Sequence, residues 1–304
     1  MSFLKSIKRY MKNPSALLLR FGNTHRMSDE RYLKLMFRDR MGYWLNLKNP
    51  QTFNEKLQWL KLYDRNPIYP NMVDKLEVKQ YIAEKTGHEY IVPTLGFWDN
   101  VDDIDFDALP EQFVLKCTHD SGGIVICKDK SQLDIGSVKK NLRKAMKKNF
   151  YDVGREWPYK NIKPRILAEP YLVDHETGEL RDYKFFCFDG VAKAMFVATE
   201  RQEAGAEVRF DFFDMQFEHL NFRQGHPNSS KTIKKPETFE QMKVLAEALS
   251  QGLPQVRVDF YEVDGKVYFG ELTFFHFDGF MPFEPEEWDY TFGSWLQLPE
   301  KQEN

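Results

Sequence analysis

Polar and apolar residues alternate along two short stretches near the C-terminus, residues 255–261 and 266–274. An Asp264-Gly265 pair lies between the stretches, which predicts a β-hairpin. A two-residue turn at this pair would distribute the polar side chains over both faces of the hairpin. A three-residue loop that starts at Val263 would collect them on one face, and we predict this register because side chains alternate along a strand. The polar face would then carry Arg257, Asp259, Glu271 and Thr273.

The rest of the chain mixes helical and strand patterns. Thr52-Phe-Asn-Glu55 is a capping box in front of an apolar stripe, and it predicts the start of a helix. Further helices are predicted over residues 73–85, 135–150 and 236–250. Strands or extended segments are predicted at residues 91–98, 113–117, 124–127, 165–172, 182–188, 191–198 and 207–213. Antiparallel strands interleaved with helices give an α+β fold.

The composition is that of a globular chain, with 42% hydrophobic residues among 304. No apolar run approaches the roughly 20 residues of a membrane-spanning helix, and no apolar core follows the basic N-terminus as in a secretory signal. Three cysteines without paired metal spacing, Cys117, Cys127 and Cys187, fit a reducing cytoplasm, which is the location we expect. Lys and Arg show no strong excess over the whole chain, so we expect no nucleic-acid partner.

Charge is distributed unevenly along the chain. Residues 1–40 hold ten Lys or Arg and three Asp or Glu, a net charge of +7, which leaves −10 for the remainder. Such a basic segment is typical either of a solvated surface helix or of contact with an anionic membrane or an acidic partner. We expect at most a weak association of this segment with the inner face of a membrane.

A glycine-containing loop follows Lys116 and ends in Ser121, Gly122 and Gly123. Adjacent glycines allow backbone amides to turn toward a phosphate, and a lysine at the end of a strand adds positive charge. The alternative is an ordinary hairpin turn. The loop lacks the Gly-Lys-Ser/Thr of a P-loop.

Two later stretches also have a functional and a structural interpretation. Glu169-Pro-Tyr-Leu172 is either a hinge that binds an adenine edge or an ordinary edge strand, where proline is tolerated. Asp182 and Lys184 share one face of a strand, either as a ribose or phosphate contact or as an exposed ion pair.

Asp259 and Glu271 are the most specific pair of residues on the polar hairpin face. Carboxylate oxygens suit Mg2+, which proteins hold with one or two carboxylates together with substrate phosphates. Arg257 beside them could clamp a phosphoryl or acyl-phosphate group. The alternative is a surface ion pair between Arg257 and Glu271 with Asp259 in solvent. None of the seven histidines has zinc-site spacing.

The motifs described above occur along the chain in an order that resembles that of the ATP-grasp superfamily. More narrowly, the chain resembles the TupA-like family of the teichuronopeptide-biosynthesis type. The supporting stretches are TFNEKLQWLK at 52–61, VDK at 73–75, FVLKCTHDSGG at 113–123, DYK at 182–184, GELTF at 270–274 and WDY at 288–290. The resemblance implies two α+β subdomains that grip Mg-ATP, preceded by helices. We therefore expect a helical region at 1–65, a part with the nucleotide-gripping lid at 66–165, and a C-terminal subdomain with the metal-binding strands at 166–298.

The resemblance also implies roles for single residues, with ATP and Mg2+ as cofactors. The residues expected to contact the nucleotide are Lys116, Ser121, Gly122, Gly123, Glu169, Leu172, Asp182 and Lys184. The residues expected to hold magnesium are Asp259, Glu271 and Thr273, the last in the place of the superfamily's usual asparagine. The residues expected to act in catalysis, by neutralising charge on the transferred phosphoryl group, are Arg257, Lys184 and Lys116.

The function implied by the resemblance is that of an ATP-dependent carboxylate–amine ligase. ATP would phosphorylate a carboxylate, and an amine would attack the acyl phosphate to form an amide. The context would be the biosynthesis or modification of a bacterial surface polysaccharide, such as a capsule. The alternative is a glycosyltransferase that uses a sugar nucleotide, and a third interpretation is a non-catalytic assembly factor that binds nucleotide.

Overall fold

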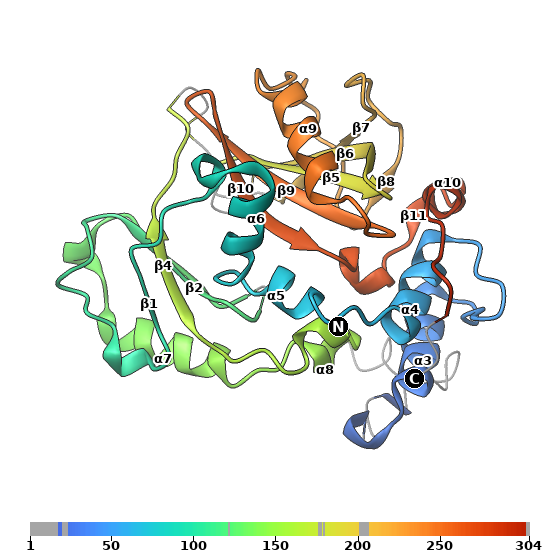
Figure 1. Ribbon diagram of the computed structural model, residues 1–304, viewed down its shortest axis with the longest axis horizontal. Helices are drawn as coiled ribbons and strands as arrows, with labels where there is room; N and C mark the ends of the chain where they lie inside the picture. Colours follow the sequence, from blue (N-terminus) through green and yellow to red (C-terminus); the bar gives the residue numbers. More distant parts are fainter. Residues whose placement is uncertain are drawn as a thin grey trace.

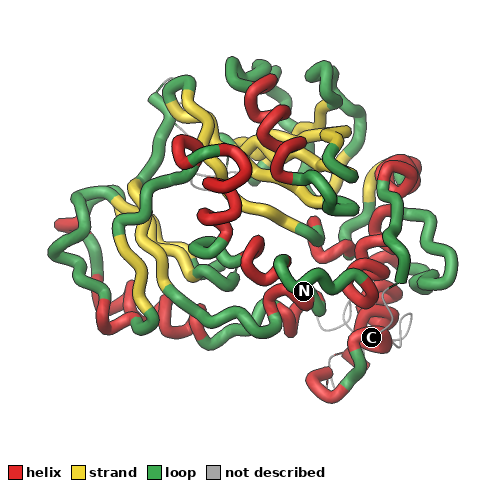
Figure 2. The backbone as a smooth tube through the Cα atoms, viewed as in Figure 1, coloured by secondary structure: helices red, strands yellow, loops and turns green. Residues whose placement is uncertain are grey.

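The computed structural model describes residues 18–19, 24–120, 122–175, 178, 180–200 and 207–301 of the chain. Two antiparallel sheets lie in different parts of the molecule, and helices pack around them (Figure 1, Figure 2). None of the helices in the described part of the chain has the length and apolar character that crossing a membrane requires. Residues 1–17, which carry part of the basic segment expected to contact a membrane, lie outside the described residues.

The smaller sheet is four-stranded, in the order β1-β4-β2-β3. Its strands are β1 (Gly96–Trp98), β2 (Phe113–Cys117), β3 (Ile124–Cys127) and β4 (Ile166–Pro170). The helix α7 (Ile135–Met146) covers one face, because its apolar side forms a core with alternate residues of β2 and β4. The intervening residues, among them Lys116 and Glu169, therefore belong to the opposite face.

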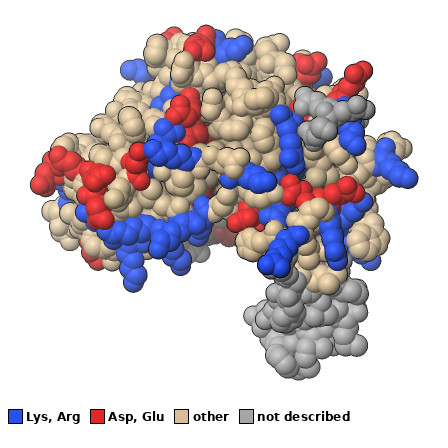
Figure 3. Space-filling model, turned by 60° about the horizontal axis from the view of Figure 1, so that its bottom comes forward, with Lys and Arg blue, Asp and Glu red and all other residues tan. Residues whose placement is uncertain are grey.

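The helix α7 ends at Met146, earlier than the predicted residue 150, and the short helix α8 (Tyr151–Gly154) follows it. The outward side of α7 carries Lys140 and Lys144, which are exposed. Lys147, directly after α7, is exposed as well. Figure 3 shows Lys and Arg side chains gathered on this side of the molecule.

The larger sheet is five-stranded, in the order β10-β9-β5-β6-β7. Its strands are β5 (Asp182–Phe188), β6 (Val191–Thr199), β7 (Arg209–Phe213), β9 (Val256–Val263) and β10 (Lys266–Thr273). The helices that share its core include α5 (Tyr69–Val73), α6 (Val78–Thr86) and α9 (Phe239–Leu249), together with two helices of the terminal segments described below. Phenylalanine is the most frequent residue of this core, which contains more than half of the 26 phenylalanines of the chain.

The boundaries predicted at 65/66 and 165/166 do not separate the segments that form the smaller sheet and its core from those that form the larger sheet and its core. The strand β4 pairs with β1 and β2 in the smaller sheet, although it follows residue 165. The helices α5 and α6 precede the smaller sheet in sequence but belong to the core of the larger one. The helix predicted over 73–85 also begins later, at Val78, because the Asp74 carboxylate accepts the amides of Leu76 and Glu77 in a preceding turn.

The terminal segments pack together beside the larger sheet (Figure 1). Their helices are α3 (Asp29–Met41), α4 (Phe53–Tyr63) and α10 (Glu287–Trp295), and a two-stranded sheet pairs β8 (Arg223–Gln224) with β11 (Phe283–Glu284). The predicted capping box begins α4: the Thr52 hydroxyl accepts from Glu55 N at 3.2 Å, and the Glu55 carboxylate accepts from Thr52 N at 3.3 Å.

The hairpin of β9 and β10 has a two-residue turn, so the predicted three-residue loop is wrong. Val263 pairs with Lys266 across the turn. Asp264 and Gly265 both have left-handed backbone angles, with φ of 51° and 74°. This is the conformation of a type I′ turn, whose twist matches that of the flanking strands.

A β-bulge at Gly270 nevertheless produces the predicted polar face. The register shifts by one residue at this glycine, after which Glu271 lies opposite Asp259 and Thr273 lies opposite Arg257. A Cβ atom on Gly270 would lie 3.1 Å from the carbonyl oxygen of Asp259, so the close approach favours glycine. A glycine inside a strand pattern is a known bulge signal, and it could have identified this register from the sequence.

We expect Thr52→Ala to lower the free energy of unfolding by about 1–2 kcal/mol, because α4 would lose a buried cap and its reciprocal bond. Chemical denaturation measures the change. Ser28→Ala is the matched control, because Ser28 caps α3 through a longer bond of 3.4 Å at an exposed site. A loss for Thr52→Ala no larger than for Ser28→Ala would contradict the importance of the capping box.

Candidate functional site

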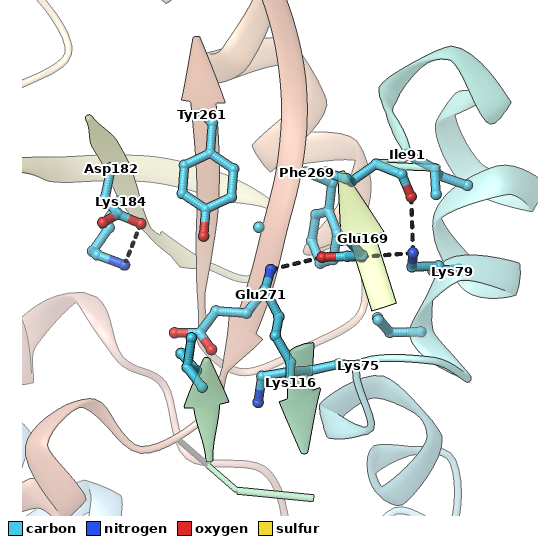
Figure 4. Close-up of a pocket in the computed structure, with 14 residues that line it drawn as sticks. Lys75, Lys79, Ile91, Lys116, Glu169, Asp182, Lys184, Tyr261, Phe269 and Glu271 are labelled. Atoms are coloured by element: carbon cyan, nitrogen blue, oxygen red, sulfur yellow. Dashed lines mark hydrogen bonds and ion pairs between the residues drawn. The ribbon is translucent and has the colours of Figure 1, made fainter. Parts of the chain in front are cut away.

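Two adjoining hollows lie between the open face of the smaller sheet and the β9–β10 hairpin of the larger one. Figure 4 shows the residues that line one of them. They contain about 770 and 790 Å³ of empty space, including the solvent at their mouths. The residues that line both are Val92, Lys116, Ile124, Glu169 and Tyr261. Together the hollows form one continuous site with two chemically different ends.

One end of the site is apolar. Ile124 and Ile126 of β3 line it and are 47% and 49% exposed, which is unusual for large aliphatic residues of a strand. Leu172 and Tyr261 belong to the same lining. Exposed aliphatic side chains that face a concave surface are typical of a ligand site for a flat apolar group.

The other end is lined by charged side chains, with four lysines and three carboxylates. Lys75 and Lys79 come from the turn before α6 and from α6 itself, Lys116 from β2 and Lys184 from β5. Asp182 and Glu271 are also part of this lining. Such a concentration of ammonium groups in a concave surface attracts a polyanion.

Glu169 links two of these lysines. Its carboxylate oxygens lie 2.6 Å from Lys79 Nζ and 2.7 Å from Lys116 Nζ, and Figure 4 shows the two lysines on opposite sides of it. Burial alone would raise the pKa of Glu169, but Lys116 and Lys79 outweigh burial and lower it. The carboxylate that was predicted to reach an adenine edge is therefore engaged by lysines.

Sequence reasoning assigned no role to Lys75 or Lys79. Lys75 closes the VDK stretch, and Lys79 follows it by four residues. Residues four positions apart lie on one face of a helix, so the spacing could have indicated from the sequence that the two lysines act at one site. In the structure Lys79 also donates to the carbonyl oxygen of Val92 at 2.8 Å, so its position is fixed by α6 and by the segment before β1.

The glycine loop is closed by its own aspartate. The backbone amides of Gly122 and Gly123 donate to Asp120 Oδ1 at 3.2 and 2.8 Å. These are the amides predicted to close over phosphates, so a phosphate would have to replace the Asp120 carboxylate. Ser121, predicted to act with them, lies outside the described residues.

Arg257 gathers the polar face of the hairpin. Its Nε and Nη2 donate to the two oxygens of Asp259, both at 2.7 Å. Nη2 also reaches Glu271 Oε1 at 3.2 Å and Thr273 Oγ1 at 2.9 Å. Asp259 is only 1% exposed, so the alternative with this carboxylate in solvent is wrong.

A second cation holds Asp259. The Nζ of Lys184 bonds Asp259 Oδ2 and lies 3.3 Å from Asp182 Oδ1. Burial alone would raise the pKa of Asp259, but Arg257 and Lys184 lower it to about 2. The carboxylate is therefore ionised at neutral pH.

Asp259 and Glu271 fit a divalent metal only if phosphates of a bound nucleotide complete its coordination shell. Glu271 is 39% exposed and lines the hollow that holds the four lysines, but both oxygens of Asp259 are engaged by Arg257 and Lys184. No group of three or more His, Cys, Asp or Glu that could hold a metal occurs in the ranges that the structure describes. Two carboxylates suffice when phosphates complete the shell, and those phosphates would also give the two cations a new partner.

The structure thus divides the predicted residues into two groups. Those that line the hollows are Lys116, Glu169, Leu172, Asp182, Lys184 and Glu271. Those that do not line them are Arg257, Asp259, Thr273, Gly122 and Gly123. Arg257 is hydrogen-bonded to the lining residue Glu271, and Asp259 to the lining residue Lys184. Thr273 is connected to the lining only through its bond with Arg257.

Comparison with protein-family models finds a match to the family described as TupA-like ATPgrasp over residues 55–297. Comparison with curated proteins finds no match. Among solved structures, a D-alanine–D-alanine ligase from Bacillus anthracis complexed with ATP has 17% identity and a TM-score of 0.39 over 66% of this chain and 54% of that one. An L-amino acid ligase from Bacillus licheniformis has 14% identity and a TM-score of 0.43 over 81% and 55%. The chain thus spans little more than half the length of these two proteins.

We expect Glu169→Gln to lower the free energy of unfolding at pH 7 by about 1–3 kcal/mol, because Lys79 and Lys116 would lose their shared counter-ion. The folded-state pKa of Glu169 lies below its ordinary value of 4.5. The contribution of ionised Glu169 to the free energy of unfolding is therefore present above about pH 4.5, and it disappears as the pH falls through the folded-state pKa.

The effect of Glu169→Gln should accordingly shrink in denaturation experiments as the pH falls from 7 to 3. Glu111→Gln, at an exposed position, is the control and should change little at any pH. If Glu169→Gln lowered the free energy of unfolding by the same amount over this whole pH range, the ionised carboxylate would not be the source of the stabilisation.

Proposed function

The chain belongs to the TupA-like ATP-grasp family, and from this premise we propose that it is an ATP-dependent ligase that joins a carboxylate to an amine. The observation that carries the proposal is the pair of adjoining hollows, one apolar and one lined by four lysines. A nucleoside triphosphate has the same division, with a flat base at one end and three anionic groups at the other. The ATP-grasp fold itself follows from the family match.

We assign the adenine to the apolar end, between Ile124 and Ile126 on one side and Leu172 and Tyr261 on the other. Glu169 would act through the lysines rather than on the base. It holds Lys79 and Lys116 at the junction of the two hollows, where the phosphate chain would begin.

At the end lined by the four lysines, the γ-phosphoryl group would pass from ATP to a carboxylate oxygen of the acceptor, with ADP as the leaving group. The amine nitrogen would then form a bond to the carbonyl carbon, and phosphate would leave as the nitrogen loses a proton. Lys184 and Arg257 would neutralise charge on the transferred group. Catalysis of this kind depends on positioning and on preorganised charge.

The residues that would hold Mg2+ are Asp259 and Glu271, with Thr273 beside them. The bound metal supplies charge neutralisation on the phosphate oxygens. Because Lys184 and Arg257 hold Asp259 in the structure, we propose that the metal enters together with the nucleotide, whose phosphates give these cations a new partner.

The teichuronopeptide type of the family suggests the substrate class. We propose that the carboxylate belongs to a bacterial surface polysaccharide, such as a uronic acid unit, and that the amine belongs to a small amino compound. The reaction would take place in the cytoplasm, at most weakly associated with the inner face of the membrane.

Purified protein is expected to release ADP only when a suitable carboxylate and amine are both present, and to be stabilised by Mg-ATP in a thermal-shift assay. Asp259→Asn and Glu271→Gln should each lower turnover by about 100-fold or more, because each removes a carboxylate that would hold the metal whose charge acts at the transferred phosphoryl group. Asp103→Asn, at an exposed position, is the control.

Full ATP binding and turnover in both carboxylate variants would refute the metal assignment. Stabilisation by a sugar nucleotide without any response to Mg-ATP would contradict the ligase proposal and favour a glycosyltransferase. Nucleotide binding without turnover over a broad panel of acceptors would favour a non-catalytic assembly factor.

We also expect Lys184→Gln to bind Mn2+ alone at least about tenfold more tightly than the unmodified protein, because the variant removes a cation that competes for Asp259. Electron paramagnetic resonance of free Mn2+ measures this affinity without nucleotide. Lys140→Gln, on the exposed side of α7, controls for the loss of one positive charge. Equal Mn2+ affinity in the two variants would argue against competition by Lys184.

A further inference from the structure

One hydrogen bond of Arg257 does not involve the polar face of the hairpin. Its Nη1 lies 2.6 Å from Nδ1 of His276, an imidazole that is only 2% exposed. A guanidinium has no acceptor, so it must donate, and Nδ1 must accept. The proton of a neutral His276 is then on Nε2, which has no hydrogen-bond partner among the residues that the structure describes.

We propose that His276 is a positioning residue for Arg257 in phosphoryl transfer, an inference that rests on the proposed ligase function. Asp259 grips the guanidinium through Nε and Nη2, and His276 holds the remaining nitrogen, Nη1. With all three nitrogens held, the guanidinium cannot rotate about its long side chain. A neutral acceptor achieves this without cancelling positive charge, whereas a further carboxylate would reduce the charge available to a phosphoryl group.

Aromatic rings fix the imidazole itself. The ring centroids of Phe186, Phe196 and Phe277 lie 5.0, 5.4 and 4.4 Å from that of His276. The Arg257 guanidinium lies 5.7 Å from the centroid of the same Phe196 ring. Burial and the neighbouring Arg257 hold the pKa of His276 well below its usual range, which agrees with a neutral acceptor.

The backbone directly after His276 adopts an unusual conformation. Phe277, Asp278 and Gly279 all have left-handed angles, with φ of 49°, 56° and 61°. Non-glycine residues rarely adopt this conformation, and it persists only where the surrounding structure holds it in place. The turn follows the end of β10 closely and directs the chain so that His276 meets Arg257.

One face of α4 holds this turn. Lys61 Nζ donates to the carbonyl oxygen of Asp278 at 2.7 Å. Gln58 Nε2 donates to the carbonyl oxygens of Asp278 and Gly279 at 2.9 and 2.8 Å. Lys61 is 1% exposed and Gln58 is fully buried, so these bonds form away from solvent, where an unpaired carbonyl would be costly.

A third residue on the same side of α4 connects the turn to the C-terminal helix. Asn54 Nδ2 donates to the carbonyl oxygen of Met281 at 3.1 Å and to Asp289 Oδ2 at 2.8 Å. Asn54, Gln58 and Lys61 are spaced by four and three residues, which aligns them on a helix. The stretches 52–61 and 288–290, which contain no residue of the proposed nucleotide site, thus support the turn that presents His276.

Three variants separate positioning from simple packing. His276→Leu keeps an apolar side chain of moderate size but removes the acceptor. His276→Asn restores an acceptor oxygen near the position of Nδ1. His226→Leu is the matched control, because His226 also packs on Phe277 and Phe210 but does not contact Arg257 in the described structure.

Calorimetry with Mg2+ should give the affinities of each variant for ADP and for the ATP analogue AMP-PNP. We expect His276→Leu to bind ADP within about threefold of the unmodified protein but to lose at least tenfold of its preference for AMP-PNP over ADP. His276→Asn should recover most of that preference, and His226→Leu should keep it. An unchanged preference in His276→Leu, or an equal loss in His276→Leu and His276→Asn, would overturn the inference.

A spectroscopic measurement tests the geometry without any nucleotide. In 15N-histidine NMR at neutral pH, the His276 signal, assigned by its absence in His276→Asn, should be that of a neutral ring protonated on Nε2. A proton on Nδ1 would overturn the inference. If the unmodified protein bound neither nucleotide while this tautomer was present, the proposed function would fail and the contact between His276 and Arg257 would stand.

Discussion

The buried pairing of Arg257 with Asp259 is the interaction on which the rest of the site depends. Both side chains leave water, which is tolerable only because two charged hydrogen bonds of 2.7 Å join them and further partners surround them. Lys184 approaches Asp259 from β5, and His276 approaches Arg257 from the turn after β10. Removing one partner would leave an uncompensated charge in the core, so the sheet, the bulge and the turn must all form together.

The two sheets contribute different chemistry to one site. The smaller sheet offers an open face on which Ile124 is exposed and Lys116 is paired with Glu169. The larger sheet offers the charged face of the β9–β10 hairpin, and α6 adds Lys79 from a third direction. The smaller sheet supplies much of the apolar lining, whereas the lysines come from both sheets and from α6 and the turn before it, so the nucleotide proposal depends on the juxtaposition of these parts.

Local signals predicted much of the fold, because capping and alternation act over a few residues. The capping box at Thr52 and the strands β2 and β3 appear where the sequence places them. The hairpin register was misjudged because a bulge at Gly270, not the turn, aligns Glu271 with Asp259. The lysines that meet at Glu169 come from residues 79 and 116, and no local pattern reports such a contact between distant segments.

The proposed position of ATP is in the two adjoining hollows, with its base at the apolar end and its phosphates among the lysines. A crystal structure with AMP-PNP and Mg2+ tests this most directly. We expect the base between Ile124 and Tyr261, the phosphates at Lys116 and Lys184, and the metal at Glu271 and Asp259. A nucleotide bound outside both hollows, or a metal bound away from the β9–β10 hairpin, would contradict it.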